Sequence, residues 1–250
     1  MSDPTFTVDL VRSVPWWGIA SALIAPFALI GGWTLAADLQ PGSFDAVSRS
    51  ISSLAAYGAT DRWVMTLGLF IVGACNLLTG LALHSAPRNG RILLMAGGVF
   101  GLLIAVSPES MGGTGIGSLR HAVVAGLGCA VMTAWPLAAL RREPWAPAGL
   151  RPAATFGVTG FLLALIAWFC FEVVSGGDMI GLAERAVTGV QTLWPLVVVA
   201  TVVAAARRRP AARPVPAVSP SRSGRLGRPE APCAPRAAAG SRVSPGLAPG

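Results

Sequence analysis

Six apolar stretches, each close to the length of a membrane-spanning helix, limit the fold of this chain more than any other feature. A helix that crosses the hydrocarbon core of a bilayer needs about 20 predominantly apolar residues. None of the six has an ionised residue in its middle, where a charge costs roughly 2.5–3.5 kcal/mol. The sequence therefore predicts an all-α polytopic bundle with six transmembrane helices. They are expected at residues 16–35, 63–84, 92–107, 119–140, 153–174 and 186–206.

The composition argues against a soluble globular protein. Apolar residues make up 53% of the 250 positions and charged residues only 12%, whereas soluble domains carry about 25% charged residues. The absence of lysine, together with abundant alanine, glycine, proline and arginine, is typical of a bacterium with a GC-rich genome. We therefore expect a multi-pass protein of a bacterial cell (plasma) membrane.

The arginines predict how the bundle is oriented. Ten of them lie at the ends that both termini share, against four, Arg49, Arg62, Arg120 and Arg185, in the opposite loops. The positive-inside rule then places both termini in the cytoplasm. This divides the chain into a cytoplasmic N-terminus at 1–15, a membrane domain at 16–206 and a cytoplasmic tail at 207–250.

The tail carries the whole net charge of +8, because it holds nine arginines against the single acidic residue Glu230. It is rich in proline, alanine, glycine and serine, so it has too few apolar groups to offset the entropy lost on ordering. We expect it to be disordered and to hold membrane lipid as its partner, since Arg207, Arg208 and Arg209 adjoin the membrane. No aromatic residues lie between its arginines, which argues against nucleic acid as a partner.

The first external loop, residues 36–62, is long for a link between two spans. Its centre, residues 43–57, has the pattern of a short amphipathic helix. Ser43 is expected to cap this helix, and Asp45 and Arg49, four residues apart, are expected to pair. The apolar stripe of the helix would consist of Phe44, Val47, Ile51 and Leu54.

Polar side chains at the predicted outer face form a candidate ligand site. A carboxylate and an imidazole, Glu109 and His121, stand at the two membrane entries of the second external loop, and polar residues at modest depth usually face the bundle interior or a wet cavity. Arg49 is expected to attract an anionic group, and a histidine makes binding sensitive to pH. The candidate ligand-binding residues are Arg49, Ser52, Glu109, His121, Glu172 and Gln191.

Small residues in the fourth span predict close helix packing. Ala122, Gly126, Ala130 and Ala134 form one row at four-residue spacing, next to the row His121, Ala125, Cys129 and Thr133. Such rows let another helix approach closely. Several tryptophans, Trp135 among them, stand near the predicted span ends, where indole favours the headgroup region.

The sequence also resembles a known family, DUF998, over residues 15–206. The resemblance rests on residues 40–54 (QPGSFDAVSRSISSL), Gly58, residues 62–66 (RWVMT), Pro108-Glu109, His121 and Glu184-Arg185. It implies a bacterial six-helix membrane protein and draws attention to the outer-face residues, while supplying no reaction. Members of the family often have aspartate where this chain has Glu109.

Several classes of function remain open. Binding of a lipid head group or small molecule in an outward-facing polar pocket is our leading hypothesis, and a structural or accessory subunit without its own site is the alternative. A membrane-embedded hydrolase, with Ser48 or Ser52 beside His121 and Glu109, and a small-molecule transporter are further alternatives. No G-x-S-x-G motif is present, and one histidine at the outer face is few for zinc. We therefore lean against an enzyme, and expect no catalytic residues, metal or cofactor.

Overall fold

The computed structural model describes residues 14–110 and 115–208, and all of its regular secondary structure is helical. The predictions for residues 1–13 and 209–250, including the disordered tail, lie outside the described residues. The six long helices are α1 (Trp16–Asp38), α3 (Trp63–Ala82), α4 (Arg88–Ala105), α5 (Gly115–Ala138), α6 (Pro152–Ser175) and α7 (Ile180–Arg207). Two short elements are α2 (Ile51–Ala55) and the 3-10 helix η2 (Ala148–Leu150).

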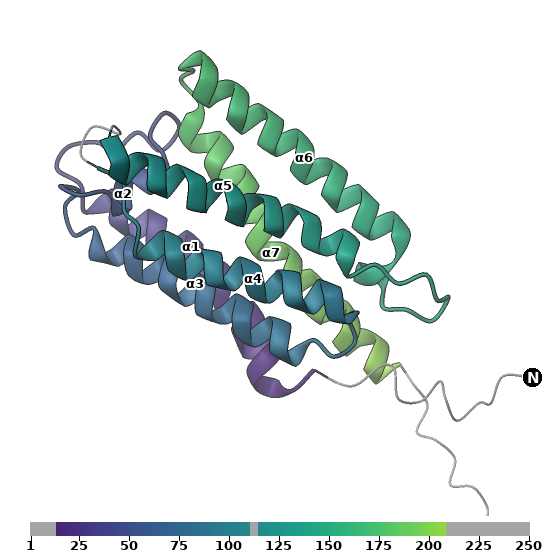
Figure 1. The fold of residues 1–250 in the computed structure, drawn as a ribbon. Coiled ribbons are helices and arrows are strands. Elements are labelled where there is room, and N and C mark those ends of the chain that lie inside the picture. Colours follow the sequence, from purple (N-terminus) through teal and green to yellow (C-terminus); the bar gives the residue numbers. More distant parts are fainter. Residues whose placement is uncertain (1–13, 111–114, 209–250) are drawn as a thin grey trace, which may run out of the picture. The chain divides into compact units, whose positions relative to one another are not determined.

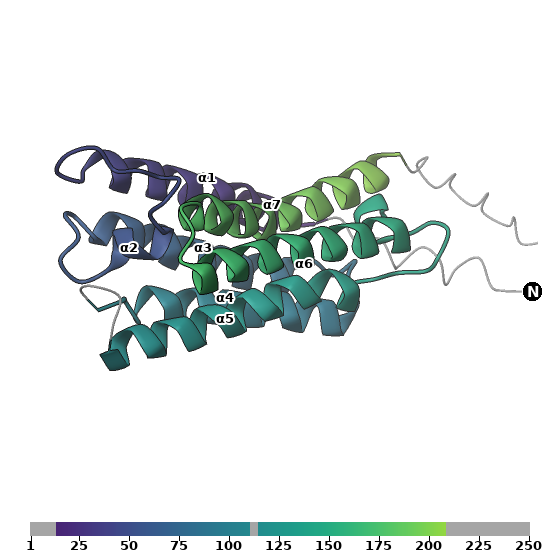
Figure 2. The same cartoon turned by 90° about the horizontal axis from the view of Figure 1, so that it is seen from above.

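The six long helices lie side by side and alternate in direction, so each end of the bundle gathers loops that are far apart in sequence (Figures 1 and 2). All six are long and apolar enough to cross a membrane, which confirms the predicted six-span bundle. We call the end with α2 and the start of α5 the His121 end. The opposite end, which holds Arg88, Arg141, Arg151 and Arg207, we call the arginine end.

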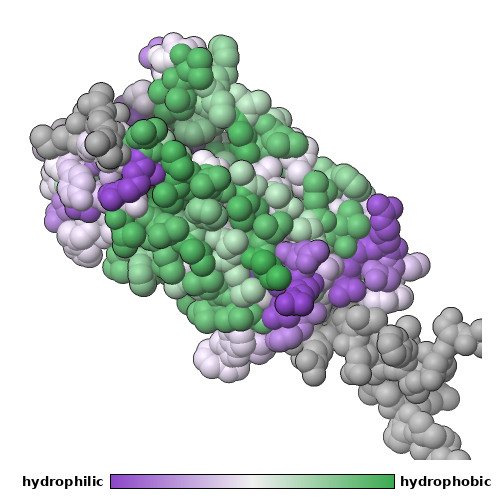
Figure 3. Space-filling model, in the orientation of Figure 1, coloured by the Kyte–Doolittle hydropathy of each residue, from purple (hydrophilic) through white to green (hydrophobic). Residues whose placement is uncertain are grey.

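The outside of the bundle is apolar. Large side chains such as Phe27, Phe70, Phe161 and Leu163 are about half exposed or more, although they would be buried in a soluble protein of this size. Figure 3 shows hydrophobic residues across the middle of the bundle, with hydrophilic residues gathered toward its two ends. This is the surface expected of a protein that is solvated by lipid.

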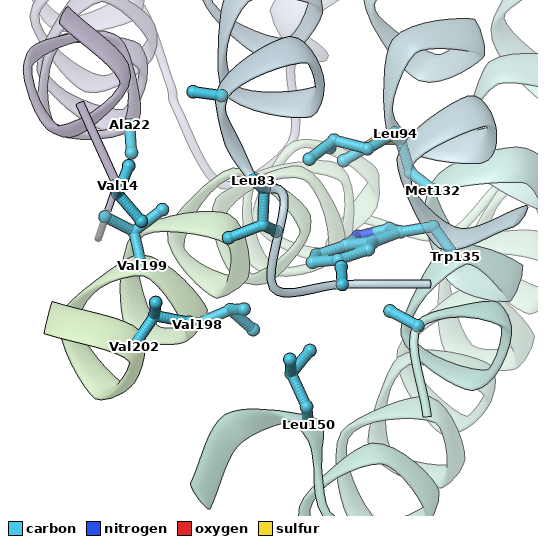
Figure 4. Close-up of a cluster of buried hydrophobic side chains, with 13 residues drawn as sticks. Val14, Ala22, Leu83, Leu94, Met132, Trp135, Leu150, Val198, Val199 and Val202 are labelled. Atoms are coloured by element: carbon cyan, nitrogen blue, oxygen red, sulfur yellow. The ribbon is translucent and has the colours of Figure 1, made fainter. Parts of the chain in front are cut away.

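Inside the bundle, the larger of two clusters of buried apolar side chains lies toward the arginine end. Trp135 of α5 is completely buried there, packed among Leu94, Leu83 and Val198 from three other segments (Figure 4). Trp135 therefore does not present its indole to the headgroup region, contrary to the expectation from its place near a span end. Its position near the end of a span does not say which way it points, and here it points into the bundle.

The two small-residue rows of α5 differ in what they contact. Cys129 and Thr133 face α7, where both lie within hydrogen-bonding distance of the Gln191 side chain. The other row, Ala122, Gly126, Ala130 and Ala134, is exposed, and nothing would contact a methyl group added at Gly126. Close packing was thus predicted correctly for one row only, because four-residue spacing places residues on one face without saying what covers it.

The helix boundaries differ from the predictions mainly at α7. This helix begins at Ile180, six residues before the predicted start, so Glu184 and Arg185 belong to it rather than to the preceding loop. Hydropathy placed the boundary too late because these two charged residues interrupt the apolar run. Their charges are tolerated inside the helix because both side chains find partners in the first external loop.

Candidate functional site

The middle of the loop at residues 36–62, which the sequence predicts to be the first external loop, is a tight turn followed by a short helix. The Asp45 carboxylate accepts hydrogen bonds from the Val47 N–H and the Ser48 hydroxyl, at 2.9 and 2.7 Å. The Ser48 hydroxyl, followed by the Val47 N–H, holds the pKa of Asp45 below its usual value. Helix α2 starts only at Ile51, with the Ser50 side chain accepting from the Ser53 N–H as its cap.

Two predictions for this loop are therefore wrong. Ser43 caps no helix, because the chain from 43 to 50 is not helical and forms a turn at 46–48. Asp45 and Arg49 do not pair, because the Asp45 carboxylate is occupied within its own turn, and the Arg49 guanidinium lies 4.6 Å from the centre of the Phe44 ring. Local hydrogen bonding of an aspartate commonly competes with helix formation in this way.

The turn is held against the start of α7. The Leu182 N–H donates to the Val47 carbonyl, and the Arg185 guanidinium donates to the carbonyls of Ala46 and Arg49 at 2.8 and 2.9 Å. Gly181 permits this approach, because a methyl group there would overlap the carbonyl oxygen atoms of the turn. The first external loop is thus fixed on the bundle by its backbone.

Three segments then meet at the side chain of Ser52. The Ser52 hydroxyl donates to Glu184 Oε1 at 2.9 Å, and His121 Nε2 lies 2.9 Å from the same hydroxyl oxygen. The other carboxylate oxygen of Glu184 accepts from the Ile51 N–H. His121 Nδ1 is 2.8 Å from the carbonyl oxygen of Ser107, just beyond α4. We call Glu184, Ser52 and His121 the Ser52 network.

The hydrogen-bond donors in the Ser52 network can be counted. The Ser107 carbonyl can only accept, so His121 carries a proton on Nδ1. Ser52 has one hydroxyl proton for two neighbours, Glu184 Oε1 and His121 Nε2. Both contacts are hydrogen bonds at once only if one further proton resides on Glu184 or on His121. A proton at either position is connected to the other through the Ser52 hydroxyl.

Glu109 lies beside the network and is partly exposed. One of its carboxylate oxygens lies 3.9 Å from His121 Nε2, and its side chain is 26% exposed while that of His121 is 5% exposed. The Glu109 carbonyl also accepts from the Tyr57 N–H, which ties the end of the loop to the segment after α4. Glu109 therefore adds a second carboxylate beside the imidazole of His121.

The side chains of the other three predicted ligand residues contact other parts of the structure and not the Ser52 network. Arg49 is exposed and lies over Phe44. The Glu172 carboxylate accepts from Trp168 Nε1 and from the Met179 N–H, which ties together the link between α6 and α7. The Gln191 amide donates to Cys129 and Thr133 deeper in the bundle, about 17 Å along α7 from its start. Only Ser52, Glu109 and His121 of the predicted set come together.

Glu184 is the network residue that the site prediction omitted. In the sequence, Glu184 is followed by an arginine and then by an apolar run. This pattern is equally compatible with the end of a loop. Within the described part of the chain, no group of three or more histidine, cysteine, aspartate or glutamate residues could hold a metal ion. The site brings together a hydroxyl, an imidazole and two carboxylates at one end of the bundle.

Fold and site together define a multi-pass α-helical membrane protein with a partly buried hydrogen-bond network at one of its ends. The model of a family described as a protein of unknown function, DUF998, matches residues 23–217. The chain belongs to this family, as the resemblance implied. Searches of curated proteins and of solved structures found no match.

Proposed function

We propose that the protein binds a polar head group at its His121 end, through Ser52, His121 and Glu109, with Glu184 holding Ser52 in place. The observation that carries this proposal is the contact of His121 Nε2 with both the Ser52 hydroxyl, at 2.9 Å, and the partly exposed Glu109 carboxylate, at 3.9 Å. Polar groups at such depth in a membrane bundle are costly and commonly functional. The arginine distribution supports an orientation with the His121 end outside and both termini in the cytoplasm, and the lysine-free, arginine-rich composition supports a bacterial plasma membrane.

The charge of the site favours a ligand that donates hydrogen bonds. Two carboxylates, Glu109 and Glu184, flank Ser52 and His121, while Arg49 and Arg185 are engaged with Phe44 and with backbone carbonyls. An amine or a hydroxyl complements these acceptors, and an anion does not. The expected anionic ligand attracted by Arg49 therefore gives way to an amine-bearing head group such as that of phosphatidylethanolamine.

Two lipids that differ in their donors test the proposal. Phosphatidylethanolamine carries ammonium N–H groups and phosphatidylcholine carries none, so purified protein in mixed micelles should retain the first over the second in native mass spectrometry. The preference should vanish in His121→Ala and Glu109→Gln and should change between about pH 5 and 8. His84→Ala is the matched control, because His84 lies at the arginine end. Equal retention of both lipids by the wild type would contradict the proposal and favour a purely structural role.

A second function, nucleophilic catalysis, is favoured by one specific contact. With the further proton on Glu184, the Ser52 hydroxyl donates to the Nε2 lone pair of His121, 2.9 Å away, which is the geometry of a serine and its general base. A fluorophosphonate probe should then label Ser52, with labelling lost in Ser52→Ala or His121→Ala. Ser53→Ala should leave it intact, because Ser53 instead donates to the Ser50 carbonyl. Unlabelled wild type would remove this second function.

A further inference from the structure

A groove of about 450 Å³ runs along the outside of the bundle at the arginine end. One side of it is the first part of α1, and the other is the last part of α7. Its walls are apolar until the final turn of α7, where two arginines close the row. The lining residues are Ile19, Leu196, Val199, Ala200, Val203, Ala204, Arg207 and Arg208.

The length of the groove matches one leaflet of a bilayer. Leu196 and Arg207 are eleven residues apart on one helix, which is about 17 Å at 1.5 Å per residue. Half of the hydrocarbon core of a membrane is about 15 Å thick. With Arg207 at the membrane–water boundary, the apolar wall therefore extends to about the middle of the bilayer, as an acyl chain does.

The side chains of the two arginines at the mouth of the groove have no partner in the described part of the chain. Both are exposed, and neither side chain makes a hydrogen bond or salt bridge there. Three other arginines at this end differ. Arg91 donates to backbone carbonyls in the last turn of α3, and Arg141 and Arg151 donate to backbone carbonyls of loops. The guanidinium groups of Arg207 and Arg208 are thus available to an anion beside the apolar wall.

We propose that this groove is a binding site for one anionic phospholipid. An acyl chain lies between Ile19 and the Val199–Val203 face of α7, and the phosphate contacts Arg207 and Arg208. Charge selects the ligand: guanidinium groups bind phosphate by paired hydrogen bonds, and a head group with an additional negative charge gains more than a zwitterionic one. This site lies at the opposite end from the Ser52 network, so it is independent of the function proposed above.

Photo-crosslinking in vesicles of defined composition tests the site. The full-length protein is reconstituted in phosphatidylcholine with about one-fifth phosphatidylglycerol, and either lipid carries a diazirine in its acyl chain. Crosslinks of phosphatidylglycerol should map to the peptides containing Ile19 and Val199–Val203. In Arg207→Gln/Arg208→Gln its preference over phosphatidylcholine should fall roughly 30-fold, which corresponds to about 1 kcal/mol for each of two charges.

Two further variants separate the groove from general attraction to the membrane. Arg88→Gln/Arg142→Gln removes two exposed arginines from the same end and should keep the crosslinks, while Ala200→Phe fills the groove and should abolish them with both arginines present. Melting temperatures in detergent confirm that each variant is folded. The proposal is overturned if the two double variants lose the preference equally, if crosslinks spread over all helices, or if free glycerol phosphate competes fully. Crosslinks that join the groove to another part of this chain, or to a second copy, would overturn it as well.

Discussion

We expect Glu184 to make the stability of the protein depend on pH through the Ser52 network. Without a further proton on Glu184 or His121, only one of the two contacts of Ser52 is a hydrogen bond, so we expect the protein to become less stable as pH rises and that proton is lost. Glu184→Gln should remove this dependence, because its amide donates to Ser52, accepts from the Ile51 N–H and frees the serine proton for His121. The melting temperatures of the wild type and of Glu184→Gln, measured in detergent as a function of pH, check both expectations. Glu109 and Arg185, the nearby charged residues, are unchanged in both proteins. A wild-type curve that matches that of Glu184→Gln would contradict the proton count.

Gly181 tests the close approach between the first external loop and α7. A methyl group there meets the carbonyl oxygen atoms of Ala46 and Arg49, and such overpacking typically costs about 1–3 kcal/mol. Gly181→Ala should therefore lower the melting temperature clearly. Gly157→Ala is the matched control, because nothing lies within 4 Å of a methyl group added at that position of α6. A Gly181→Ala protein as stable as the control would show that the loop is not held there.

The turn at 45–48 should loosen in acid. Its hydrogen bonds lower the pKa of the Asp45 carboxyl, so they stabilise the turn above the pKa of the unfolded segment, about 3.9, and this contribution is lost as pH falls through the lower pKa of the folded turn. Hydrogen exchange at Val47, corrected for intrinsic rates, should therefore rise in acid. Asp45→Asn should exchange faster at neutral pH and show little further change. Exchange that is independent of pH in the wild type would contradict the assignment.

Contacts between α5 and α7 depend on one amide. The Gln191 side chain donates to the Cys129 carbonyl at 3.0 Å and lies 3.1 Å from the Thr133 hydroxyl. Gln191→Leu should therefore lower the free energy of unfolding by about 1 kcal/mol. Thr192→Val is a suitable control, because the Thr192 hydroxyl donates only within its own helix. A larger loss in the control than in Gln191→Leu would argue that the cross-helix bond contributes little.

The elements were predictable from the sequence to the extent that hydropathy determines them. Six long apolar runs identify six spans because hydrocarbon imposes the length and the composition. Hydropathy fails at α7, where Glu184 and Arg185 belong to the helix, and at 43–50, where the Asp45 turn replaces the first part of a helix. Both errors arise where a polar side chain has a partner that the local pattern does not reveal.

At the scale of the whole molecule, the candidate site was only half predictable. His121 and Glu109 were expected to meet because they flank one loop, and they do lie 3.9 Å apart. The bond between Ser52 and Glu184 spans 132 residues, and no spacing in the sequence signals it. The packing of α7 beside α1 and the loop determines that contact, so only a structure could identify it.

The account rests on the two ends of the bundle lying on opposite sides of a membrane. In a chain whose native cysteines are replaced by alanine, we would introduce Thr60→Cys at the His121 end and Arg142→Cys at the arginine end. Both positions are exposed, and intact bacterial cells would be treated with a maleimide that does not cross membranes. We predict that residue 60 is labelled in intact cells and residue 142 only after permeabilisation. Labelling of both positions in intact cells, or of residue 142 alone, would contradict the account.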